Sequence, residues 1–213
     1  MVSAFRERLL AGVQSIGRSL SDREIEALTV HYRLLQEWSN RMNLTGIKDL
    51  DSIVRRHFLE PIAASDLVGE DGRLVDLGSG NGFPAIPLKV LRPRLDLVLV
   101  EASEKKSSFL WAVLRELRLQ TARVETRHVR ETADLADLFP CRYLTLRAIQ
   151  ARRVLKGRPI PILEPGGKGL FFLSAMDAET LKRRPVAGLS LIDTRPLPGG
   201  PDSVVAILEP GTT

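Results

Sequence analysis

Hydrophobic residues in the first third of the chain recur at the spacing of helices. The first apolar face is formed by Phe5, Leu9, Val13 and Ile16. A second face follows Ser21, which stands three residues before Glu24 as in a capping box. The polar residues 40–51 predict a loop, and residues 52–67 predict another helix. The pattern therefore predicts a helical extension over residues 1–70.

From residue 73 onward, short apolar runs alternate with helical patterns. Runs of strand length occur at residues 73–77, 96–101, 122–127, 142–147 and 168–173. Helical patterns separate them at residues 84–92, 103–118, 131–138 and 149–157. This alternation predicts a parallel sheet with right-handed crossover connections.

The chain ends on a different pattern. Two apolar runs, residues 189–192 and 204–208, are joined by a segment rich in proline and glycine. The connection is too short for a crossover helix, so we expect an antiparallel pair. The predicted fold class is α/β: a Rossmann-like, doubly wound, mostly parallel seven-stranded sheet that closes in an antiparallel hairpin. This is the class I S-adenosylmethionine-dependent methyltransferase variant of the fold, predicted here over residues 71–213.

A glycine-rich segment after the first predicted strand carries the strongest chemical signal. An apolar run ends at Asp76, and Gly78, Gly80 and Gly82 follow at alternate positions. Glycine adopts φ values that other residues avoid, so such a loop can approach a ligand closely. Phe83 stands where a dinucleotide-binding loop carries its third glycine. The segment instead resembles the first motif of the class I S-adenosylmethionine-dependent methyltransferases, and a nicotinamide-dependent oxidoreductase stays open as an alternative.

An acidic residue ends the second predicted strand. Glu101 follows an apolar run and lies 23 residues after Gly78. In folds of this type, an acidic side chain about 20 residues beyond the loop accepts hydrogen bonds from ribose hydroxyls. The loop and the acid together predict a nucleotide cofactor site at the carboxyl ends of the strands.

The composition indicates in which compartment the protein is found and which kinds of partner it has. With 44% hydrophobic and 27% charged residues, the chain has the composition of an ordinary globular protein. The single cysteine suits a reducing cytoplasm, and no apolar run reaches the roughly 18 residues of a membrane span. The three histidines share no metal-ligand spacing. We expect a cytoplasmic monomer without a membrane or metal partner.

Basic residues gather after the fourth predicted strand. The chain has a net charge of +5, and residues 142–158 contain several arginines and lysines but no acidic residue. This run is next to the predicted cofactor site, which suits a polyphosphate substrate such as RNA. A solvated surface without a ligand is the alternative interpretation of such a run.

Three segments resemble one protein family in order and spacing. They are residues 38–45 (WSNRMNLT), 56–60 (RHFLE) and 76–88 (DLGSGNGFPAIPL). They are similar to the RsmG family, also called glucose-inhibited division protein B, the bacterial guanine-N7 methyltransferases of 16S ribosomal RNA. The resemblance covers about residues 20–150. It implies methyl transfer from S-adenosylmethionine to a guanine N7, with ribosomal RNA or the small ribosomal subunit as the partner.

The candidate site residues combine the strand pattern, the basic run and this resemblance. The expected cofactor contacts are Asp76, Gly78, Gly80, Gly82, Phe83, Glu101, Arg130, Glu131 and Arg147. The backbone N–H groups of residues 130–131 are expected along the adenine edge. The expected substrate contacts are Asn43, His57, Arg147, Arg152 and Arg153. Both His57 and Asn43 also have a structural interpretation: His57 as a partly buried, hydrogen-bonded histidine, and Asn43 as a residue that caps and fixes its loop.

No catalytic residue is expected. Guanine N7 carries an in-plane lone pair that is unprotonated near neutral pH, so attack on a sulfonium methyl needs no general base. Cys141 begins the fourth predicted strand, away from the cofactor, and is expected to be buried and inert. The chain departs from the family pattern at Ala85, Arg130 and Ser174. A class I methyltransferase with another RNA or small-molecule substrate and a non-catalytic RNA-binding relative therefore stay open.

Overall fold

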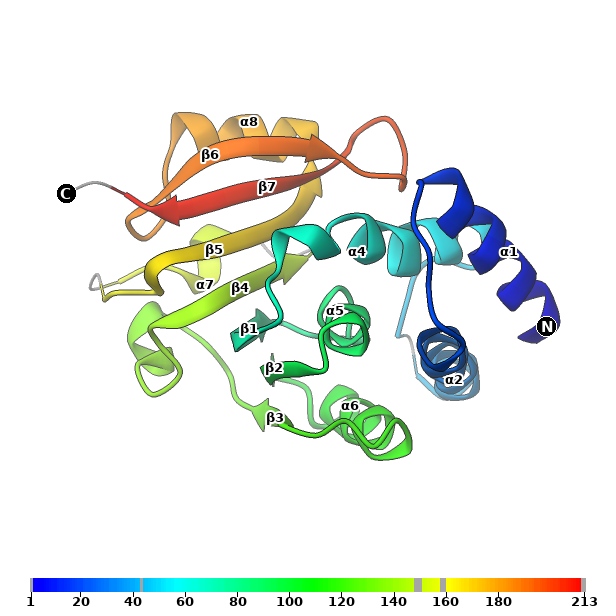
Figure 1. Cartoon of the computed structure of the whole chain (residues 1–213). Helices are drawn as coiled ribbons and strands as arrows, with labels where there is room; N and C mark the ends of the chain where they lie inside the picture. The colour runs from blue at the N-terminus through cyan, green and yellow to red at the C-terminus, as the bar shows by residue number, and fades with distance from the viewer. Residues whose placement is uncertain (1, 43, 148–150, 158–159, 212–213) are drawn as a thin grey trace.

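The computed structural model describes residues 2–42, 44–147, 151–157 and 160–211 (Figure 1). Asn43, a predicted substrate contact, lies outside the described residues. The strands are β1 (Asp71–Leu77), β2 (Arg94–Glu101), β3 (Ala122–Thr126), β4 (Cys141–Arg147), β5 (Leu163–Ser174), β6 (Leu189–Pro196) and β7 (Ser203–Pro210). The helical elements are α1 (Val2–Ser15), α2 (Asp22–Ser39), α3 (Leu50–Ile53), η1 (Val54–Leu59), α4 (Glu60–Ala63), η2 (Ser65–Leu67), α5 (Ala85–Leu91), α6 (Glu104–Glu116), η3 (Thr132–Leu135), α7 (Ala151–Val154) and α8 (Ala175–Arg183).

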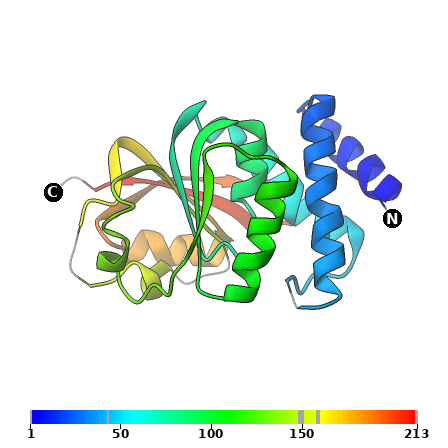
Figure 2. The same cartoon turned by 90° about the horizontal axis from the view of Figure 1, so that it is seen from below.

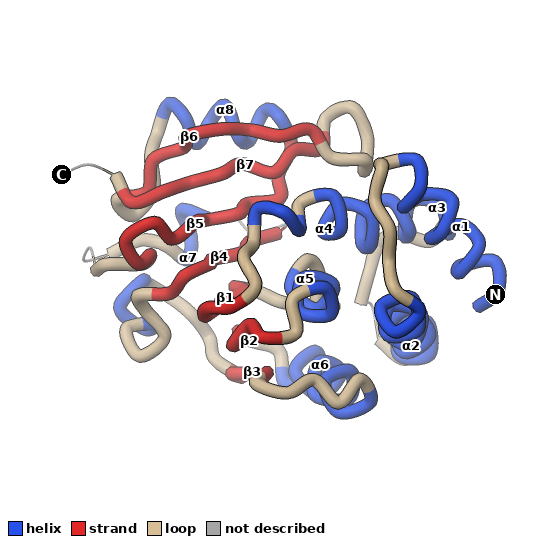
Figure 3. The backbone as a smooth tube through the Cα atoms, in the orientation of Figure 1, coloured by secondary structure: helices blue, strands red, loops and turns tan. Residues whose placement is uncertain are grey.

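The strands form one seven-stranded sheet in the order β3-β2-β1-β4-β5-β7-β6 (Figure 3). Strands β1 to β5 pair in parallel, whereas β7 is antiparallel to both β5 and β6. Because β1 lies between β2 and β4, the chain reverses its direction of winding beside β1, and such a reversal opens a crevice at the carboxyl ends of the strands. The predicted fold class is confirmed.

The helical extension is built as the sequence predicts, with one irregular turn. The predicted capping box begins α2: the Glu24 N–H donates to Ser21 Oγ over 3.3 Å, and the Ser21 N–H donates to Glu24 Oε2 over 2.7 Å. The helix predicted at residues 52–67 is a succession of short pieces with η1, a π-helical turn, in the middle. At its end the Glu60 N–H donates to the Arg55 carbonyl, five residues back. Such widened turns are frequent at functional sites.

Two predicted crossover helices are wrong in extent, and one helix was missed. Residues 131–138 form only the 3₁₀ turn η3, because the Asp134 carboxylate accepts the N–H groups of Arg130 and Glu131 and so competes with a helix. Of residues 149–157, the described part contains only the single turn α7. The missed helix is α8, which begins where the Asp177 N–H donates to Ser174 Oγ over 3.1 Å.

The two faces of the sheet carry separate hydrophobic cores. Leu74, Leu97 and Leu99 point to the face covered by α5, α6 and the helical extension, whereas the side chains next to them in sequence point to the face covered by α7 and α8. Figure 2 shows α2 beside α6, with α1 outside it. Helix α5 begins after Pro84 as predicted, but it is not amphipathic: six of its seven residues are buried, because α2 and α4 cover its outer side.

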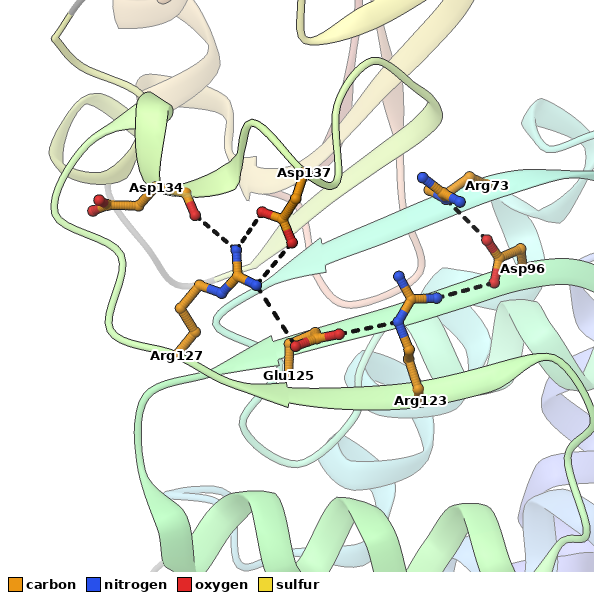
Figure 4. Close-up of polar contacts among 7 residues, drawn as sticks. All are labelled: Arg73, Asp96, Arg123, Glu125, Arg127, Asp134 and Asp137. Carbon is orange, nitrogen blue, oxygen red and sulfur yellow. Dashed lines mark hydrogen bonds and ion pairs between the residues drawn. The ribbon is translucent and has the colours of Figure 1, made fainter.

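A ladder of charged side chains covers the sheet near β3, where the crossover supplies no full helix (Figure 4). Asp96 on β2 pairs with Arg73 on β1 (2.9 Å) and with Arg123 on β3 (3.4 Å). The ladder continues through Glu125 to Arg127 at the end of β3. Arg127 then donates to both carboxylate oxygens of Asp137, over 2.6 and 2.9 Å, and to the Asp134 carbonyl. This ladder fastens the segment after β3 to the sheet.

Within the described ranges, no helix combines the length and the apolar character needed to cross a bilayer.

The extension and the sheet should unfold together, because they share one hydrophobic core. Phe5 on α1 is fully buried, stacks on Tyr32 at 4.1 Å between ring centroids, and meets the edge of Phe58. We expect Phe5→Ala to lower the free energy of unfolding of the whole chain by about 3–5 kcal/mol. Urea titrations followed by circular dichroism and by tryptophan fluorescence should both show one transition, shifted equally. A shift confined to one of two separate transitions would contradict this expectation.

Candidate functional site

The glycine-rich loop is tied to the neighbouring strand by its backbone. The N–H groups of Gly78 and Ser79 donate to the Val100 carbonyl on β2, over 2.8 and 3.1 Å. Gly80 and Gly82 have φ values of +53° and +83°, which favour glycine. At Gly82 a Cβ would also lie only 2.4 Å from the Ile86 side chain on α5. Gly82 is therefore needed for packing behind the loop.

Glu101 connects this loop to the end of β2. Its side chain is buried, with Oε2 accepting the Gly80 N–H and Oε1 accepting the Ser103 N–H, both over 2.8 Å. A carboxylate oxygen has a second lone pair, so both oxygens can still accept a hydroxyl group. The carboxylate thus orders the loop and retains the capacity to bind a diol such as a ribose.

A cavity of about 510 Å³, here called the loop cavity, lies at the carboxyl ends of β1, β2 and β4. It is lined by predicted site residues from several elements: His57, Gly78, Gly80, Phe83, Glu101 and Arg147. It is also lined by residues that were not predicted, among them Thr45, Lys106, Arg127, His128 and Val129. The structure thus brings together residues that are distant in sequence.

Asp76 lies behind the loop cavity rather than along it. Its side chain is buried, and Oδ1 accepts the Thr145 hydroxyl of β4 over 2.6 Å. Burial raises its pKa to about 7, and the nearby negative charge of Glu101 adds to this rise. Because it bonds to β4, Asp76 holds the end of β1 in register with that strand. Its place among the cofactor contacts is therefore indirect.

The segment after β3 lines the loop cavity with residues 127–129, not with the predicted residues 130–131. The N–H groups of Arg130 and Glu131 both donate to Asp134 Oδ2, over 2.8 and 3.2 Å, so this arrangement does not direct them to a ligand. Among the described residues lining the loop cavity are residues 127–129, and neither Arg130 nor Glu131 is included. The acid three residues after Glu131 is the sequence signal for this local capping.

Phe83 is held between two histidines of the helical extension. His31 on α2 stacks on one side at 4.4 Å between centroids, and His57 on η1 stacks at 4.6 Å. His31 Nε2 also donates to the Asn81 carbonyl of the loop over 3.0 Å. His57 Nε2 lies 3.0 Å from the hydroxyl of Thr45, which accepts the Ile47 N–H. The structural interpretation of His57 is supported, and the same ring also faces the loop cavity.

Both histidines of this stack are neutral at pH 7. Burial lowers the pKa of His31 to about 4, against a smaller opposite effect of its bond to Asn81. The pKa of His57 is lowered to about 3, mainly by burial and to a smaller extent by the positive charges of Arg147 and Arg56. The stack therefore contributes an uncharged wall to the loop cavity.

A second cavity, here called the β5 cavity, adjoins the first. It has a volume of about 660 Å³ and lies between the helical extension, the ends of β4 and β5, and α8. His57 and Arg147 line both cavities and so form their shared wall. Apolar lining comes from Phe172, Leu173 and Leu181, and polar lining from Arg152, Ser174 and Asp177, with others. Arg153, also predicted to bind substrate, is exposed on α7.

Arg147 in the shared wall is fixed by a buried carboxylate. Its guanidinium forms an ion pair with Glu60 on α4, donates to the Arg56 carbonyl, and lies 5.1 Å from the centre of the Phe172 ring. Glu60 is almost fully buried and also accepts the Ser203 hydroxyl over 2.6 Å. Burial lowers the pKa of Arg147 to about 9, so the side chain keeps its charge at neutral pH. The sequence predicts Arg147 at this edge of the sheet, but it does not identify Glu60 as the partner of Arg147.

Cys141 begins β4 at the opposite end of the sheet from the loop cavity. It is buried, and burial raises the pKa of its thiol to about 12. Its predicted inert role agrees with this placement. In the part of the chain that the structure describes, no group of three or more His, Cys, Asp or Glu side chains is arranged to hold a metal ion.

The reversed last strand and the glycine loop facing Glu101 define the class: a class I methyltransferase. Solved structures with this fold include a ribosomal protein L11 methylase from Lactobacillus delbrueckii subsp. bulgaricus (TM-score 0.54, 8% identity, covering 78% of this chain and 81% of that one). Another is a precorrin-6y C5,15-methyltransferase from Geobacter metallireducens (TM-score 0.51, 14% identity, covering 78% and 90%). At these identities the likeness concerns the fold alone.

The particular family follows from sequence comparison. Residues 24–189 match the family described as rRNA small subunit methyltransferase G (GidB). The chain is 36% identical over 172 residues to the ribosomal RNA small subunit methyltransferase G of Desulfitobacterium hafniense, covering 78% of this chain and 68% of that protein. It is also 36% identical over 165 residues to the protein of that name from Chloroflexus aggregans, covering 76% and 69%. The chain belongs to this family of S-adenosylmethionine-dependent methyltransferases, as its motifs predict.

The neutral histidines make stability depend on pH. A histidine whose pKa is depressed by folding contributes stability that is fully present above its unfolded pKa, about 6.5, and is lost as the pH falls. We expect the free energy of unfolding to decline between pH 6.5 and 4.5 more steeply in the wild type than in His31→Gln, by about 1.4 kcal/mol per pH unit. Urea titrations at several pH values measure this difference. Equal slopes for the two proteins would mean that His31 is not buried as a neutral ring.

Proposed function

We propose that this protein transfers a methyl group from S-adenosylmethionine to N7 of a guanine in the 16S ribosomal RNA of the small subunit. The family supports methylation of ribosomal RNA. The observation that carries the proposal is the pair of adjoining cavities with one shared wall, His57 and Arg147. Two adjoining cavities suit a reaction in which one group passes directly between two bound molecules. A ribosomal substrate also agrees with the cytoplasmic location expected from the sequence.

The loop cavity fits S-adenosylmethionine by the chemistry of its lining. In this proposal the Glu101 carboxylate accepts both ribose hydroxyls, and the glycine loop lets the backbone come close to the bound molecule. Residues 127–129 lie along the adenine, and Arg147 faces the carboxylate of the methionine moiety. When bound, the cofactor supplies an electrophilic methyl group on a sulfonium. The polar and apolar parts of this lining thus match the parts of the molecule.

The β5 cavity is then the place of the acceptor base. Its apolar lining, Phe172, Leu173 and Leu181, suits the faces of a purine. Arg152 lines this cavity and Arg153 is exposed on the same short helix, so in this proposal both contact RNA phosphates. Orientation of the two reactants where the cavities meet, beside the shared wall, can by itself supply much of the acceleration.

The shared wall does not oppose the movement of positive charge. Bound S-adenosylmethionine would bring a positive charge on its sulfonium, and a methylated purine would carry one too, so an unpaired cation in the shared wall would weaken the binding of both. Glu60 neutralises Arg147, and His57 is neutral because burial lowers its pKa to about 3. Since N7 already carries a free lone pair, these residues need only orient the reactants and exclude water. In-line displacement without a general base is the mechanism proposed.

The test uses purified protein, methyl-labelled S-adenosylmethionine, and small ribosomal subunits from a strain that lacks the family's enzyme. Borohydride–aniline treatment cleaves RNA at N7-methylguanine, so we expect one new cleavage site in the 16S RNA. Incorporation of label without a new cleavage site would mean that the acceptor atom is not N7. Absence of label despite cofactor binding would contradict the proposed activity and favour a non-catalytic relative.

Glu101 should determine cofactor affinity. Replacing it by glutamine removes the charge that strengthens hydrogen bonds from the ribose hydroxyls, while keeping the shape of the side chain. We expect Glu101→Gln to weaken S-adenosylmethionine binding roughly 10- to 100-fold by calorimetry. Glu104→Gln is the matched control, because Glu104 is exposed at the start of α6 and does not line the loop cavity. If the two variants bind S-adenosylmethionine with equal affinity, Glu101 does not bind the ribose.

A further inference from the structure

The β5 cavity has a carboxylate on the side away from the shared wall. Along the sheet, β1 and β2 with the loop cavity lie on one side of β4, whereas β5 and β7 lie on the other. Helix α8 packs on β5, β6 and β7, so its residues in the β5 cavity lie beyond β5. Among them is Asp177 in the first turn of α8.

Asp177 differs from the other carboxylate lining this cavity. Glu60 is buried beside the wall, and its two oxygens are engaged by Arg147 and Ser203. Asp177 is exposed, and its Oδ2 accepts the Ser174 hydroxyl over 2.7 Å. The Asp177 N–H in turn donates to Ser174 Oγ over 3.1 Å, which fixes the side chain at the start of the helix. Among the described residues, no hydrogen bond to Asp177 Oδ1 is present. The carboxylate is thus held in place at the edge of the β5 cavity, and it keeps lone pairs that can accept further hydrogen bonds.

A guanine base carries two hydrogen-bond donors that would complement the Asp177 carboxylate. N7 lies on the five-membered ring, whereas the N1–H and the 2-amino group lie at the opposite end of the base. A guanine with N7 at the wall formed by His57 and Arg147 therefore directs its two donors away from that wall, toward α8. A carboxylate can accept both donors at once. Adenine would present the lone pair of N1 there, and its repulsion by the carboxylate would exclude it.

We propose that Asp177, oriented by Ser174, selects guanine by accepting the N1–H and the 2-amino group of the acceptor base. Phe172 and Leu181 meet the faces of the base, and Ser174 keeps the carboxylate in its position. Asp177 is a specificity-determining contact and takes no part in the transfer itself. This assignment rests on the proposed function, since it needs a guanine whose N7 faces the shared wall.

The experiment uses small subunits reconstituted with 16S RNA that carries either guanine or inosine at the cleavage site located above. Inosine keeps N7, O6 and N1–H but lacks the 2-amino group. For the wild type we expect kcat/KM to fall roughly 10-fold with inosine, as for the loss of one hydrogen bond to a charged partner. For Asp177→Asn we expect a roughly 10- to 100-fold lower rate on guanine, and an inosine-to-guanine ratio close to one.

The ratio is measured within each variant, so partial loss of folded protein cancels. Glu179→Gln is the matched control on the same helix, because Glu179 is exposed, pairs with Arg183 and does not line the β5 cavity. It should keep the wild-type rate and the wild-type ratio. Binding of S-adenosylmethionine should be the same in all three proteins. An unchanged inosine penalty in Asp177→Asn, or a wild-type rate on guanine, would overturn the assignment while leaving the proposed function intact. Failure of the wild type to methylate guanine at N7 would instead overturn the proposed function.

Discussion

The position of the helical extension against the glycine-rich loop is the constraint on which the site depends. His31 and His57 come from α2 and η1, yet they enclose Phe83 of the loop at stacking distance. Three residues after His57, Glu60 neutralises Arg147 at the end of β4. His57 lies within the π turn η1 and Glu60 directly follows it, so this turn sets their relative direction. One short helical segment therefore forms a wall of both cavities, so the extension is part of the site rather than a cover over a complete domain.

The opposite wall of the loop cavity has another origin. The crossover from β3 to β4 contains a 3₁₀ turn in place of a full helix, and its buried Leu135 packs on the sheet. A ladder of alternating charges lies beside this apolar contact, and Arg127 extends the ladder to Asp137. Each exposed pair contributes little by itself, but the bidentate pair and the bond to the Asp134 carbonyl together fix residues 127–129 along the loop cavity. Polar contacts thus complete a wall that a short apolar turn supports from behind.

Sequence patterns were sufficient wherever the signal was local and periodic. The positions of the strands, the capping box at Ser21 and the loop with its partner acid Glu101 are all readable from spacing. The lengths of β5, β6 and β7 are not, because these strands extend beyond the apolar runs that predict them. The patterns failed where a side chain competes with the backbone, as Asp134 does for the N–H groups after β3. They also failed for Glu60, since nothing in a helical stretch tells which of its carboxylates meets an arginine 87 residues away.

The missed helix α8 shows how a departure from a family pattern can relocate chemistry. Ser174, one of the positions at which the sequence departs from the family pattern, accepts the Asp177 N–H and begins the helix. Together with Asp177 it brings an oriented negative charge to the β5 cavity. The wall on the opposite side of this cavity is an ion pair without net charge. In the proposed complex, Asp177 on α8 is the carboxylate that faces the base, while Arg152 brings a positive charge to the same cavity. Helix α8, rather than the glycine-rich loop, is therefore the element that would distinguish one purine from another.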